Sequence, residues 1–589
     1  MSLSSLPLKD RPALVRQQFP HFDIAGFIIT RGDEYLGEYV APYAERLAWL
    51  TGFTGSAGLA ILLNDKGCVF SDGRYTVQMK DQTLPEHWET RHSGKTPPRQ
   101  WLEEHAQGLR IGYDPTLVSQ RELAAWSSPH IQLIALEGNP IDAAWTDQPV
   151  PPTTPIIHHP LEFTGKTSRE KRAELAQQLR KAGQEAMIIA DCPSLAWLLN
   201  IRGHDIAMTP IAHAYGILYA SGQVEIFAEQ SRFHDAVEDD GILPKAPSSL
   251  PTALQHLSGK LVRLDPATTP LWFRMTLEAA GAEIADGPDL CTLPKAIKTK
   301  TEQDGNRRAH QLDSIALARF LHWVEKHGVG QRETALAAKL ESFRALSPDY
   351  KGPSFETISA AGPNGAYPHY RAEVGHDSIL TENCVYLVDS GAQYPFGTTD
   401  ITRTLWIGPD EPPAALKKAF TAVLRGHIAL SRQRFPHGLP GYRLDSVARS
   451  ALWNMGLDFD HGTGHGIGSY LSVHEGPQSI SVALRPTGLV PGMILSNEPG
   501  YYEVGAYGIR IENLLLVKES TLNGPSGPFL EFETLTHTPI DKRLIDTAHL
   551  TPDERQWLDR YHATVQERLL PLLERELHEW VKESCAPLT

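Results

Sequence analysis

Two stretches in the first half of the chain repeat the same order of predicted elements. Each has an apolar strand-like run (25–30 and 185–190), then a Leu-Ala-Trp-Leu segment (47–50 and 195–198), a glycine and two further apolar runs. Short apolar runs mixed with helical patterns are typical of α/β domains. The repeated order predicts a duplicated α/β domain, with coincidence among common patterns as the alternative.

Two changes in composition predict the domain boundaries. Residues 138–165 hold six prolines, which can neither sustain a helix nor donate to a sheet ladder. A polar, lysine-rich stretch at 293–305 precedes a long helical pattern. We therefore expect α/β domains at 1–150 and 151–297. They are followed by an α+β domain at 298–589, whose last part, from about 530, is a helical extension.

Composition limits the classes of function. The chain of 589 residues carries a net charge of −15 and no basic stripe, so we expect no nucleic-acid or anionic-membrane partner. Its five cysteines are scattered and never in C-x-x-C spacing, which favours a reducing compartment. No signal peptide and no membrane-spanning run is evident, so we expect a cytoplasmic protein.

Two aspartates lie in strand-like runs that a short connection joins. Asp389 ends an apolar run in YLVDSGA, and Asp400 begins an alternating run in TTDITRT. A hairpin centred between Tyr394 and Pro395 places the two carboxylates opposite each other, where like charges are destabilising. A cation between them would remove the conflict; a bulge that turns one aspartate to solvent is the alternative.

Three further motifs supply ligand-type side chains. HGTGHGIG holds His461 and His465 among glycines, which disfavour a helix and allow close approach to a ligand. Glu498 in LSNEPGYY precedes a Pro-Gly turn, and alternation in YGIRIENLLLV places Arg510 and Glu512 on one face of a strand. That strand is apolar enough to be buried, and a buried carboxylate needs a partner or a metal.

Together these residues read as a donor set for two metal ions. Asp389, Asp400, Glu498 and Glu512 bring four negative charges and His465 a neutral imidazole, which matches two divalent cations. Oxygen-rich sites with one imidazole suit hard or borderline ions such as manganese. Two such ions can share a hydroxide and polarise a carbonyl, which is chemistry for hydrolysing an amide.

The ordered motifs VDSGA, TTDITRT, HGTGHGIG, VHEGP, SNEPGYY and GIRIEN resemble those of the pita-bread metallopeptidases. That family includes methionine aminopeptidase, prolidase and aminopeptidase P. The two α/β domains, together with FTGSAG, SDGRY and SLAWLLNIRG, are most similar to the three-domain aminopeptidases P, so the resemblance covers nearly the whole chain. It implies two creatinase-like domains before a pita-bread catalytic domain.

The resemblance also implies roles for individual residues. The metal ligands would be Asp389, Asp400, His465, Glu498 and Glu512, with Asp400 and Glu512 contacting both ions. Catalytic roles would fall to His369, His474, Glu498 and His461. The pocket for a second-position proline would be formed by Phe355, His369, Val473, His474, Tyr502 and Arg510; core packing is the alternative for Phe355 and Val473. Tyr367 and Pro368 depart from the aliphatic residues of many relatives, which puts the fine shape of the pocket in doubt.

Hydrolysis of the bond between a first residue and a following proline is the function this resemblance implies, with two manganese ions expected and zinc, cobalt or magnesium as alternatives. A homodimer is also expected. Prolidase, which cuts dipeptides, is the nearest rival. Methionine aminopeptidase would not need the N-terminal domains, and creatinase lacks this ligand set. A non-catalytic peptide-binding relative would be expected to have lost ligands, and all five are present here.

Overall fold

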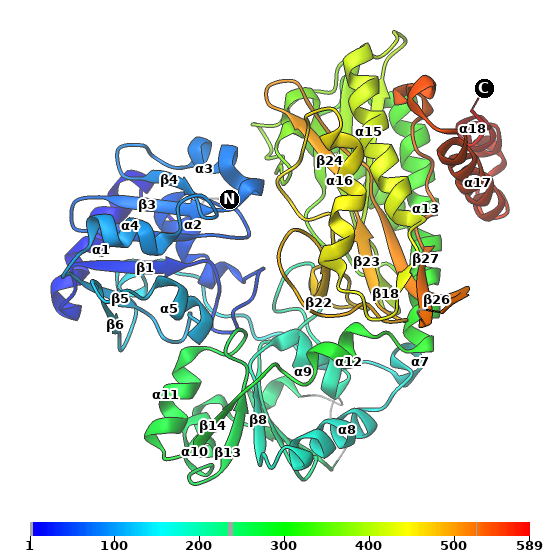
Figure 1. Cartoon of the computed structure of the whole chain (residues 1–589). Helices are drawn as coiled ribbons and strands as arrows, with labels where there is room; N and C mark the ends of the chain where they lie inside the picture. Colours follow the sequence, from blue (N-terminus) through cyan, green and yellow to red (C-terminus); the bar gives the residue numbers. More distant parts are fainter. Residues whose placement is uncertain (1–3, 234–239, 526, 589) are drawn as a thin grey trace. The chain divides into compact units, whose positions relative to one another are not determined.

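The computed structural model describes residues 4–233, 240–525 and 527–588 (Figure 1). The chain forms two compact units. One contains Met1–Leu161 and Lys166–Thr292, and the other contains Glu162–Gly165 and Leu293–Thr589. Both α/β domains therefore lie in the first unit, and all five predicted ligands lie in the second.

The first unit holds two sheets with the same topology. The first sheet has the order β4-β3-β2-β1-β5-β6 and the second β12-β11-β10-β8-β13-β14. In each sheet, the second and third strand pairs of this order are antiparallel and the other three pairs are parallel. The predicted duplication is therefore confirmed at the level of strand order and direction.

The strands of the first sheet are β1 (Gly26–Thr30), β2 (Leu59–Leu63), β3 (Gly67–Ser71), β4 (Glu89–His92), β5 (Arg110–Tyr113) and β6 (Gln132–Ala135). Those of the second are β8 (Ala186–Ile189), β10 (Tyr215–Tyr219), β11 (Val224–Phe227), β12 (Ile242–Lys245), β13 (Leu261–Leu264) and β14 (Glu283–Asp286). The helices of this unit include α1 (Arg11–Gln18), α2 (Arg46–Thr51), α3 (Thr76–Gln82), α4 (Pro98–His105), α5 (Gln120–Trp126), α6 (Pro140–Ala144), α8 (Ser168–Lys181), α9 (Cys192–Leu199), α10 (Leu250–Gln255) and α11 (Leu271–Ala279).

The repeated Leu-Ala-Trp-Leu segments form the buried short helices α2 and α9. The proline-rich segment is less irregular than predicted, because α6 begins inside it. Asn139 caps that helix and Pro140 occupies its first turn, where a missing N–H costs nothing.

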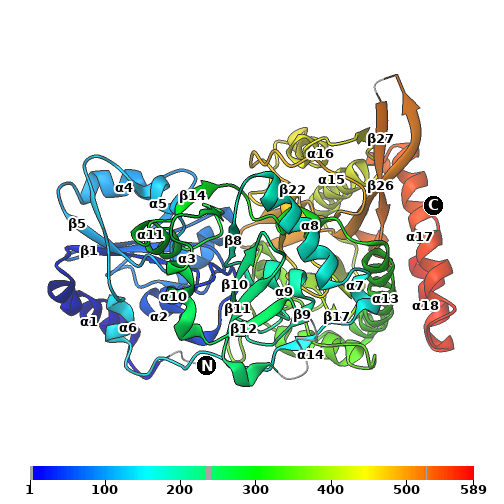
Figure 2. The ribbon, with the colours of Figure 1, turned by 90° about the horizontal axis from the view of Figure 1, so that it is seen from below.

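The second unit is α+β. A six-stranded sheet of order β20-β27-β26-β23-β21-β22 accompanies a three-stranded sheet, β15-β16-β19, and the hairpins β17-β18 and β24-β25. The strands are β15 (Ile358–Ala361), β16 (Cys384–Ser390), β17 (Gln393–Tyr394), β18 (Gly397–Thr398), β19 (Ile401–Ile407), β20 (Phe435–Pro436), β21 (Gly464–Gly466), β22 (Glu475–Ile480), β23 (Ile494–Asn497), β24 (Gly500–Glu503), β25 (Tyr507–Arg510), β26 (Asn513–Gly524) and β27 (Gly527–Thr534). Figure 2 shows the β26–β27 hairpin projecting beyond the helices of its unit.

Helices of this unit pack around the sheets. They include α13 (Lys300–His327), α14 (Glu333–Arg344), α15 (Ala414–Ser431), α16 (Asp445–Trp453), α17 (Pro552–Leu569) and α18 (His578–Ser584). A single apolar core joins Phe420 and Val423 of α15 with Leu558 and Val565 of α17 and with Ile509 of β25. The C-terminal extension therefore shares the core of the catalytic domain.

The predicted C-terminal helix is confirmed as α17. A capping box between Thr551 and Glu554 starts it, and it ends at Leu569, two residues before Pro571. Leu558, Tyr561 and Val565 of this helix are buried, whereas Trp557 is only partly covered.

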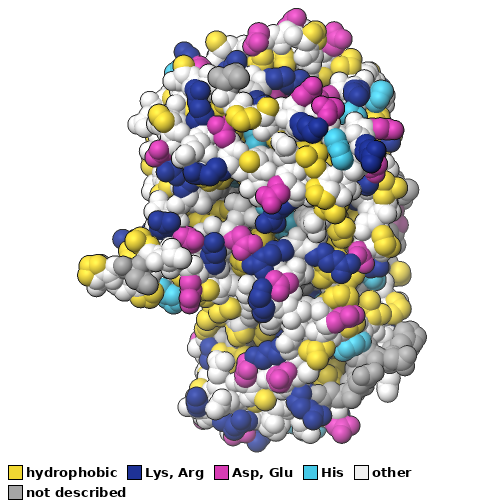
Figure 3. Space-filling model, turned by 90° about the vertical axis from the view of Figure 1, so that its right-hand side faces the viewer, with side chains coloured by type: hydrophobic (Ala, Val, Ile, Leu, Met, Phe, Trp, Pro, Cys, Tyr) yellow, Lys and Arg dark blue, Asp and Glu magenta, His cyan; other side chains and the backbone are white. Residues whose placement is uncertain are grey.

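On the face seen in Figure 3, basic and acidic side chains are interspersed. Among the described residues, none of the helices combines the length and the apolar character needed to cross a bilayer.

A close backbone approach fixes β25, the strand that leads into Glu512. A Cβ built on Gly508 would fall 1.7 Å from the carbonyl oxygen of Gly365, an overlap that backbone atoms cannot relieve by rotating a side chain. Gly508→Ala should therefore lower the free energy of unfolding by about 3 kcal/mol, measured by urea denaturation. Gly524→Ala is the control, because its Cβ would meet nothing closer than 4.0 Å; equal effects of the two substitutions would contradict the packing described here.

Candidate metal centre

The hairpin that carries both aspartates differs in register from the prediction. Asp389 pairs with Thr402, not with Asp400. Pro395 and Phe396 form the two-residue turn, since Tyr394 pairs with Gly397. Proline favours the first central position of a turn, so the hairpin is centred one position later than predicted. Asp400 therefore lies two positions before the partner of Asp389, on the same face and in a diagonal relation.

Each ligand candidate lies at or beside a strand end. Asp389 is the penultimate residue of β16, Asp400 immediately precedes β19 and His465 is the central residue of β21. Glu498 follows β23, and Glu512 lies in the break between β25 and β26. Strand ends allow the chain to turn a carboxylate inward while the adjoining strand stays fixed by its ladder.

Four of the five ligand candidates lie close together. Donor atoms of Asp400, His465 and Glu512 all lie within 4.8 Å of one another. His465 Nε2 lies 3.6 Å from Asp400 Oδ2 and 3.3 Å from Glu498 Oε1. His465 Nδ1 is 3.0 Å from the carbonyl oxygen of Gly466, which makes Nδ1 the protonated nitrogen and leaves the Nε2 lone pair directed at the carboxylates.

Burial and mutual repulsion dominate the electrostatics. Burial, and then the charge of Glu512, raise the pKa of Asp400 well above its usual value; burial, and then Glu498, do the same to the pKa of Glu512. Burial raises the pKa of Glu498 to about 7, although Arg510 opposes the shift. Buried carboxylates that repel one another are stabilised by cations placed between them.

Two buried carboxylate oxygens without donors indicate whether metal ions fit this site. Asp389 Oδ1 and Glu512 Oε1 are buried and accept no hydrogen bond from any described residue. Buried carboxylate oxygens without a donor are costly unless a cation takes the donor's place. With four carboxylates and one oriented imidazole, the donor set fits hard or borderline divalent ions.

Arg510 links one ligand candidate to Tyr502, a predicted substrate residue, and through it to His461, a predicted catalytic residue. Its Nη2 donates to Asp389 Oδ2 (2.6 Å) and its Nη1 donates to the Tyr502 hydroxyl (2.6 Å). The Tyr502 hydroxyl lies 2.8 Å from His461 Nε2, and His461 Nδ1 lies 2.8 Å from the carbonyl oxygen of Gly462. The second contact assigns the proton to Nδ1, so Tyr502 donates to Nε2. Arg510 therefore donates in two directions, to Asp389 on one side and through Tyr502 toward His461 on the other.

Two other predicted substrate residues lie beside this cluster. The His474 ring packs edge to face on His465, with centroids 4.3 Å apart. A Cβ built on Gly391, in the loop after Asp389, would fall 2.9 Å from Phe355 Cε1, so the Phe355 ring lies against that loop.

For His369 and Val473, position in the fold is what the structure adds. His369 lies in the segment between β15 and β16, next to Tyr370, whose hydroxyl donates to the buried Glu333 (2.8 Å). Val473 is buried and precedes His474. Their roles in the substrate pocket stay predictions.

Two hydroxyl residues that sequence reasoning missed hold the ligands. Thr402 Oγ1 donates to Glu512 Oε2 (2.7 Å) and accepts from Arg510 Nε (3.2 Å). Ser496 Oγ accepts from the His465 backbone N–H (2.9 Å) and donates to Glu498 Oε1 (3.0 Å). Arg510 and Glu512 thus meet at Thr402, although the single strand predicted for them is interrupted, since β25 ends at Arg510 and β26 begins at Asn513. Both hydroxyl residues lie two positions from a ligand candidate in the sequence.

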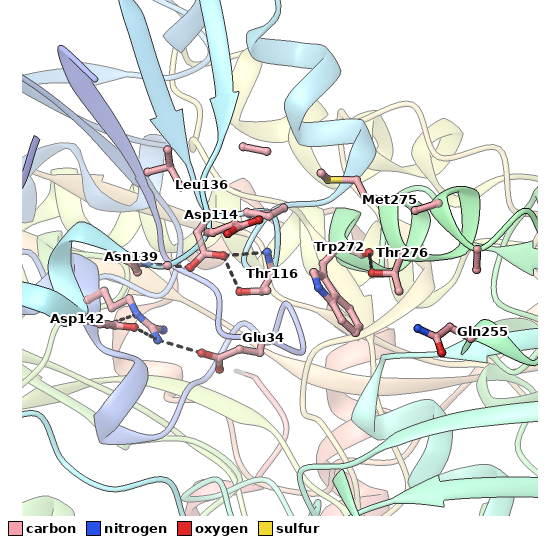
Figure 4. Close-up of a pocket in the computed structure, with 17 residues that line it drawn as sticks. Glu34, Asp114, Thr116, Leu136, Asn139, Asp142, Gln255, Trp272, Met275 and Thr276 are labelled. Atoms are coloured by element: carbon pink, nitrogen blue, oxygen red, sulfur yellow. Dashed lines mark hydrogen bonds and ion pairs between the residues drawn. The ribbon is translucent and has the colours of Figure 1, made fainter. Parts of the chain in front are cut away.

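A hollow in the first unit is acidic but differs in kind. Its volume is about 720 Å³, and Glu34, Asp114 and Asp142 line it (Figure 4). Arg46 pairs with Asp142 (2.7 Å) and Glu34 (2.9 Å), and Asn139 donates to Asp114 (3.0 Å). Because the protein supplies a donor to each of these carboxylates, no cation is needed in the donor's place.

The fold and the donor set together define a metallopeptidase. Residues 304–519 match the model of metallopeptidase family M24, and residues 528–588 match the C-terminal region of peptidase M24. Residues 13–138 and 147–302 each match a creatinase/prolidase N-terminal domain, in agreement with the duplicated sheets.

Relatives extend this match over the whole chain. A probable Xaa-Pro aminopeptidase P from Laccaria bicolor is 37% identical over 98% of this chain and 93% of its own length. The crystal structure of an X-prolyl aminopeptidase from Caenorhabditis elegans, described as a cytosolic enzyme with a di-nuclear active site, superposes with a TM-score of 0.93 at 32% identity, covering 99% of this chain and 100% of that one. The chain therefore belongs to metallopeptidase family M24, among the Xaa-Pro aminopeptidase P relatives.

A prolidase from Pyrococcus horikoshii shares the fold over a smaller part. It is 24% identical, with a TM-score of 0.51, and covers 63% of this chain and 99% of its own. The full length of this chain is thus matched by the Laccaria bicolor and Caenorhabditis elegans relatives and not by that prolidase.

The Thr402 hydroxyl provides a test of how the ligands are held. Thr402→Val removes the donor to Glu512 while keeping the shape of the side chain, so Glu512 should lose its fixed orientation. We expect about 10-fold weaker Mn²⁺ binding by isothermal titration calorimetry. Thr421→Val is the control, since its hydroxyl donates to the Lys417 carbonyl on α15 (2.7 Å); unchanged Mn²⁺ affinity in Thr402→Val would contradict this assignment.

Proposed function

We propose that this protein is a metal-dependent aminopeptidase that hydrolyses the bond between an N-terminal residue and a following proline. The observation that carries the proposal is the convergence of Asp400, His465 and Glu512 in a chain whose entire length resembles Xaa-Pro aminopeptidases P. The runner-up, a prolidase, would use the same donors on dipeptides.

Two divalent cations, with manganese expected, would be held by the five predicted ligands: Asp389, Asp400, His465, Glu498 and Glu512. When bound, such ions activate a water molecule and polarise the scissile carbonyl. The protein's contribution is orientation: the Nδ1–H of His465 and the hydroxyls of Thr402 and Ser496 fix the ligand atoms before substrate arrives.

His474 and Glu498 are the proposed groups for proton transfer and charge stabilisation. His474 lies against His465 and would donate to the developing oxyanion. Glu498 would take the proton of the attacking water at Oε2, because Ser496 already donates to Oε1. It would then pass that proton to the proline nitrogen, which must gain one to leave as an amine.

Preference for proline would come from the residues around this site. Proline at the second position lacks an N–H and has a fixed ring. Phe355, Val473 and Tyr502 would form the apolar and aromatic wall for that ring, while Arg510 keeps Tyr502 in place and His369 contributes from the preceding segment. His461 would support Tyr502 by accepting a hydrogen bond from its hydroxyl.

The cellular location of the protein is proposed from that of a relative. Cytoplasmic residence agrees with the description of the Caenorhabditis elegans enzyme as cytosolic. We propose that the protein forms a homodimer and acts on peptides with proline at position 2. We propose no nucleic-acid or membrane partner.

Substrate choice tests the proposed activity. Metal-stripped protein with added Mn²⁺ should release the first residue from an Xaa-Pro-Yaa tripeptide, and should leave an Xaa-Ala-Yaa peptide intact, when products are followed by liquid chromatography. Faster cleavage of an Xaa-Pro dipeptide would move the assignment to prolidase. Silence on every peptide with every metal would favour a binding protein.

Asp400→Ala separates the metal site from the fold. Burial and neighbouring carboxylates raise the pKa of Asp400, so its removal relieves repulsion in the metal-free protein. We expect loss of hydrolysis by at least about 1000-fold, the order of a major electrostatic contribution to catalysis. The metal-free variant should unfold at a temperature no lower than the metal-free parent, and hydrolysis near the parent rate would refute the proposed site.

A further inference from the structure

Behind the proposed metal centre lies a buried arginine that holds Glu512 from the backbone side. Arg403 is on β19 and only 1% of it is exposed. Its Nη1 donates to the carbonyl oxygens of Glu512 (2.7 Å) and Thr402 (2.9 Å). The Glu512 N–H donates to that same Thr402 oxygen (3.2 Å). Both the N–H and the carbonyl of Glu512 are therefore fixed by β19.

Arg403 forms no ion pair with a carboxylate among the residues that the structure describes. Its acceptors are all neutral: the carbonyl oxygens of Thr402, Glu512, Thr538 and Pro539, the side-chain oxygen of Asn513 and the hydroxyl of Tyr561. Burial lowers the pKa of this guanidinium. A buried cation that forms no direct ion pair is held by its hydrogen bonds, so the arrangement of these acceptors fixes the position of Arg403.

The C-terminal extension supplies one of these acceptors from α17. The Tyr561 hydroxyl accepts from Arg403 Nη2 (2.9 Å) and donates to the Thr538 carbonyl (2.8 Å). The Tyr561 ring stacks on Trp557, one turn earlier in α17, with centroids 5.4 Å apart and planes 4° apart. Since the ring is fixed by stacking, the hydroxyl is presented to Arg403 in one position.

A second contact of α17 reaches the strand of another ligand. Trp557 packs edge-on against His427 of α15, with centroids 6.2 Å apart. His427 Nδ1 donates to the Asn497 carbonyl (3.1 Å), and its Nε2 accepts from Asn513 Nδ2 (3.2 Å). Asn497 precedes Glu498 and Asn513 follows Glu512, so α17 covers the groups that tie together the two strands bearing these glutamates.

We propose that α17 completes the metal centre, and that Tyr561 is a positioning residue which, through Arg403, fixes the backbone of Glu512. The inference rests on the proposed two-metal site. Nη2 shares its two hydrogens among three acceptors, so without the hydroxyl the guanidinium shifts toward the two that remain, the Asn513 side-chain oxygen and the Thr538 carbonyl. The Glu512 carbonyl, held 2.7 Å from Nη1, moves with it, and the carboxylate is displaced from its place beside Asp400 and His465.

Tyr561→Phe tests this role, because it keeps the stacked ring and removes the hydroxyl alone. Mn²⁺ affinity, measured by isothermal titration calorimetry, should weaken about 10-fold, as for other groups that orient a metal ligand. At saturating Mn²⁺, kcat on the proline tripeptide should fall while KM stays within about twofold. Calorimetric affinity does not depend on hydrolysis, so the inference can fail while the proposed function stands.

Glu574→Gln is the matched control within the same extension. It removes the ion pair with Arg319 of α13, which lies at the surface and has no contact with Arg403. Mn²⁺ affinity and kcat should match the parent. Equal losses in Glu574→Gln and Tyr561→Phe would assign the effect to loosened docking of the extension and overturn the proposal.

A double-mutant cycle separates positioning from packing. Arg403→Lys retains the charge but not the fork of donors, so it should weaken Mn²⁺ binding as Tyr561→Phe does. The double variant should lose no more than the worse single variant, because both act through one path. Additive losses, parent-like Mn²⁺ affinity in Tyr561→Phe, or failure of that variant to fold while Glu574→Gln folds would each overturn the proposal.

Discussion

Repulsion among buried carboxylates is the interaction on which the catalytic unit depends. Asp400 and Glu512 are almost fully buried, and burial and neighbouring carboxylates raise their pKa values. Among the described residues, no donor reaches Asp389 Oδ1 or Glu512 Oε1. The fold must therefore hold these groups together against their own electrostatics. Divalent cations reverse the sign of that interaction, so the same geometry that costs free energy without metal becomes a binding site with it.

The strand ladder and hydrogen bonds around the cluster hold these carboxylates together against their repulsion. The β16–β19 ladder fixes Asp389 and Asp400, and β19 also holds Glu512 through Thr402 and Arg403. Behind the strands, a layer of buried hydrogen-bonding groups connects α15, β19, β23, β26 and α17. The C-terminal extension thus belongs to the support of the site, since its helix shares both the apolar core and this polar layer.

Sequence reasoning reached the fold class and the duplicated α/β domains from periodicity and the order of elements, and it reached the ligand set from the resemblance to the pita-bread metallopeptidases. It missed the hairpin register by one position of the turn, since a proline can stand on either side of the centre of a short loop until strand pairing decides. It could not find Arg403 or Tyr561. Their importance arises from contacts between residues 158 positions apart, and nothing in a local pattern marks such a pair. Thr402 and Ser496, by contrast, stand two residues from Asp400 and Glu498 and could be suspected.

The most direct test of this account is crystallography of the protein soaked with Mn²⁺, using anomalous scattering at the manganese edge. Two anomalous peaks should appear among Asp389, Asp400, His465, Glu498 and Glu512, about 3.5–4 Å apart as in other two-metal sites. A single peak would reduce the centre to one ion. The absence of any peak near these carboxylates would contradict the claim that bound metal ions offset their mutual repulsion.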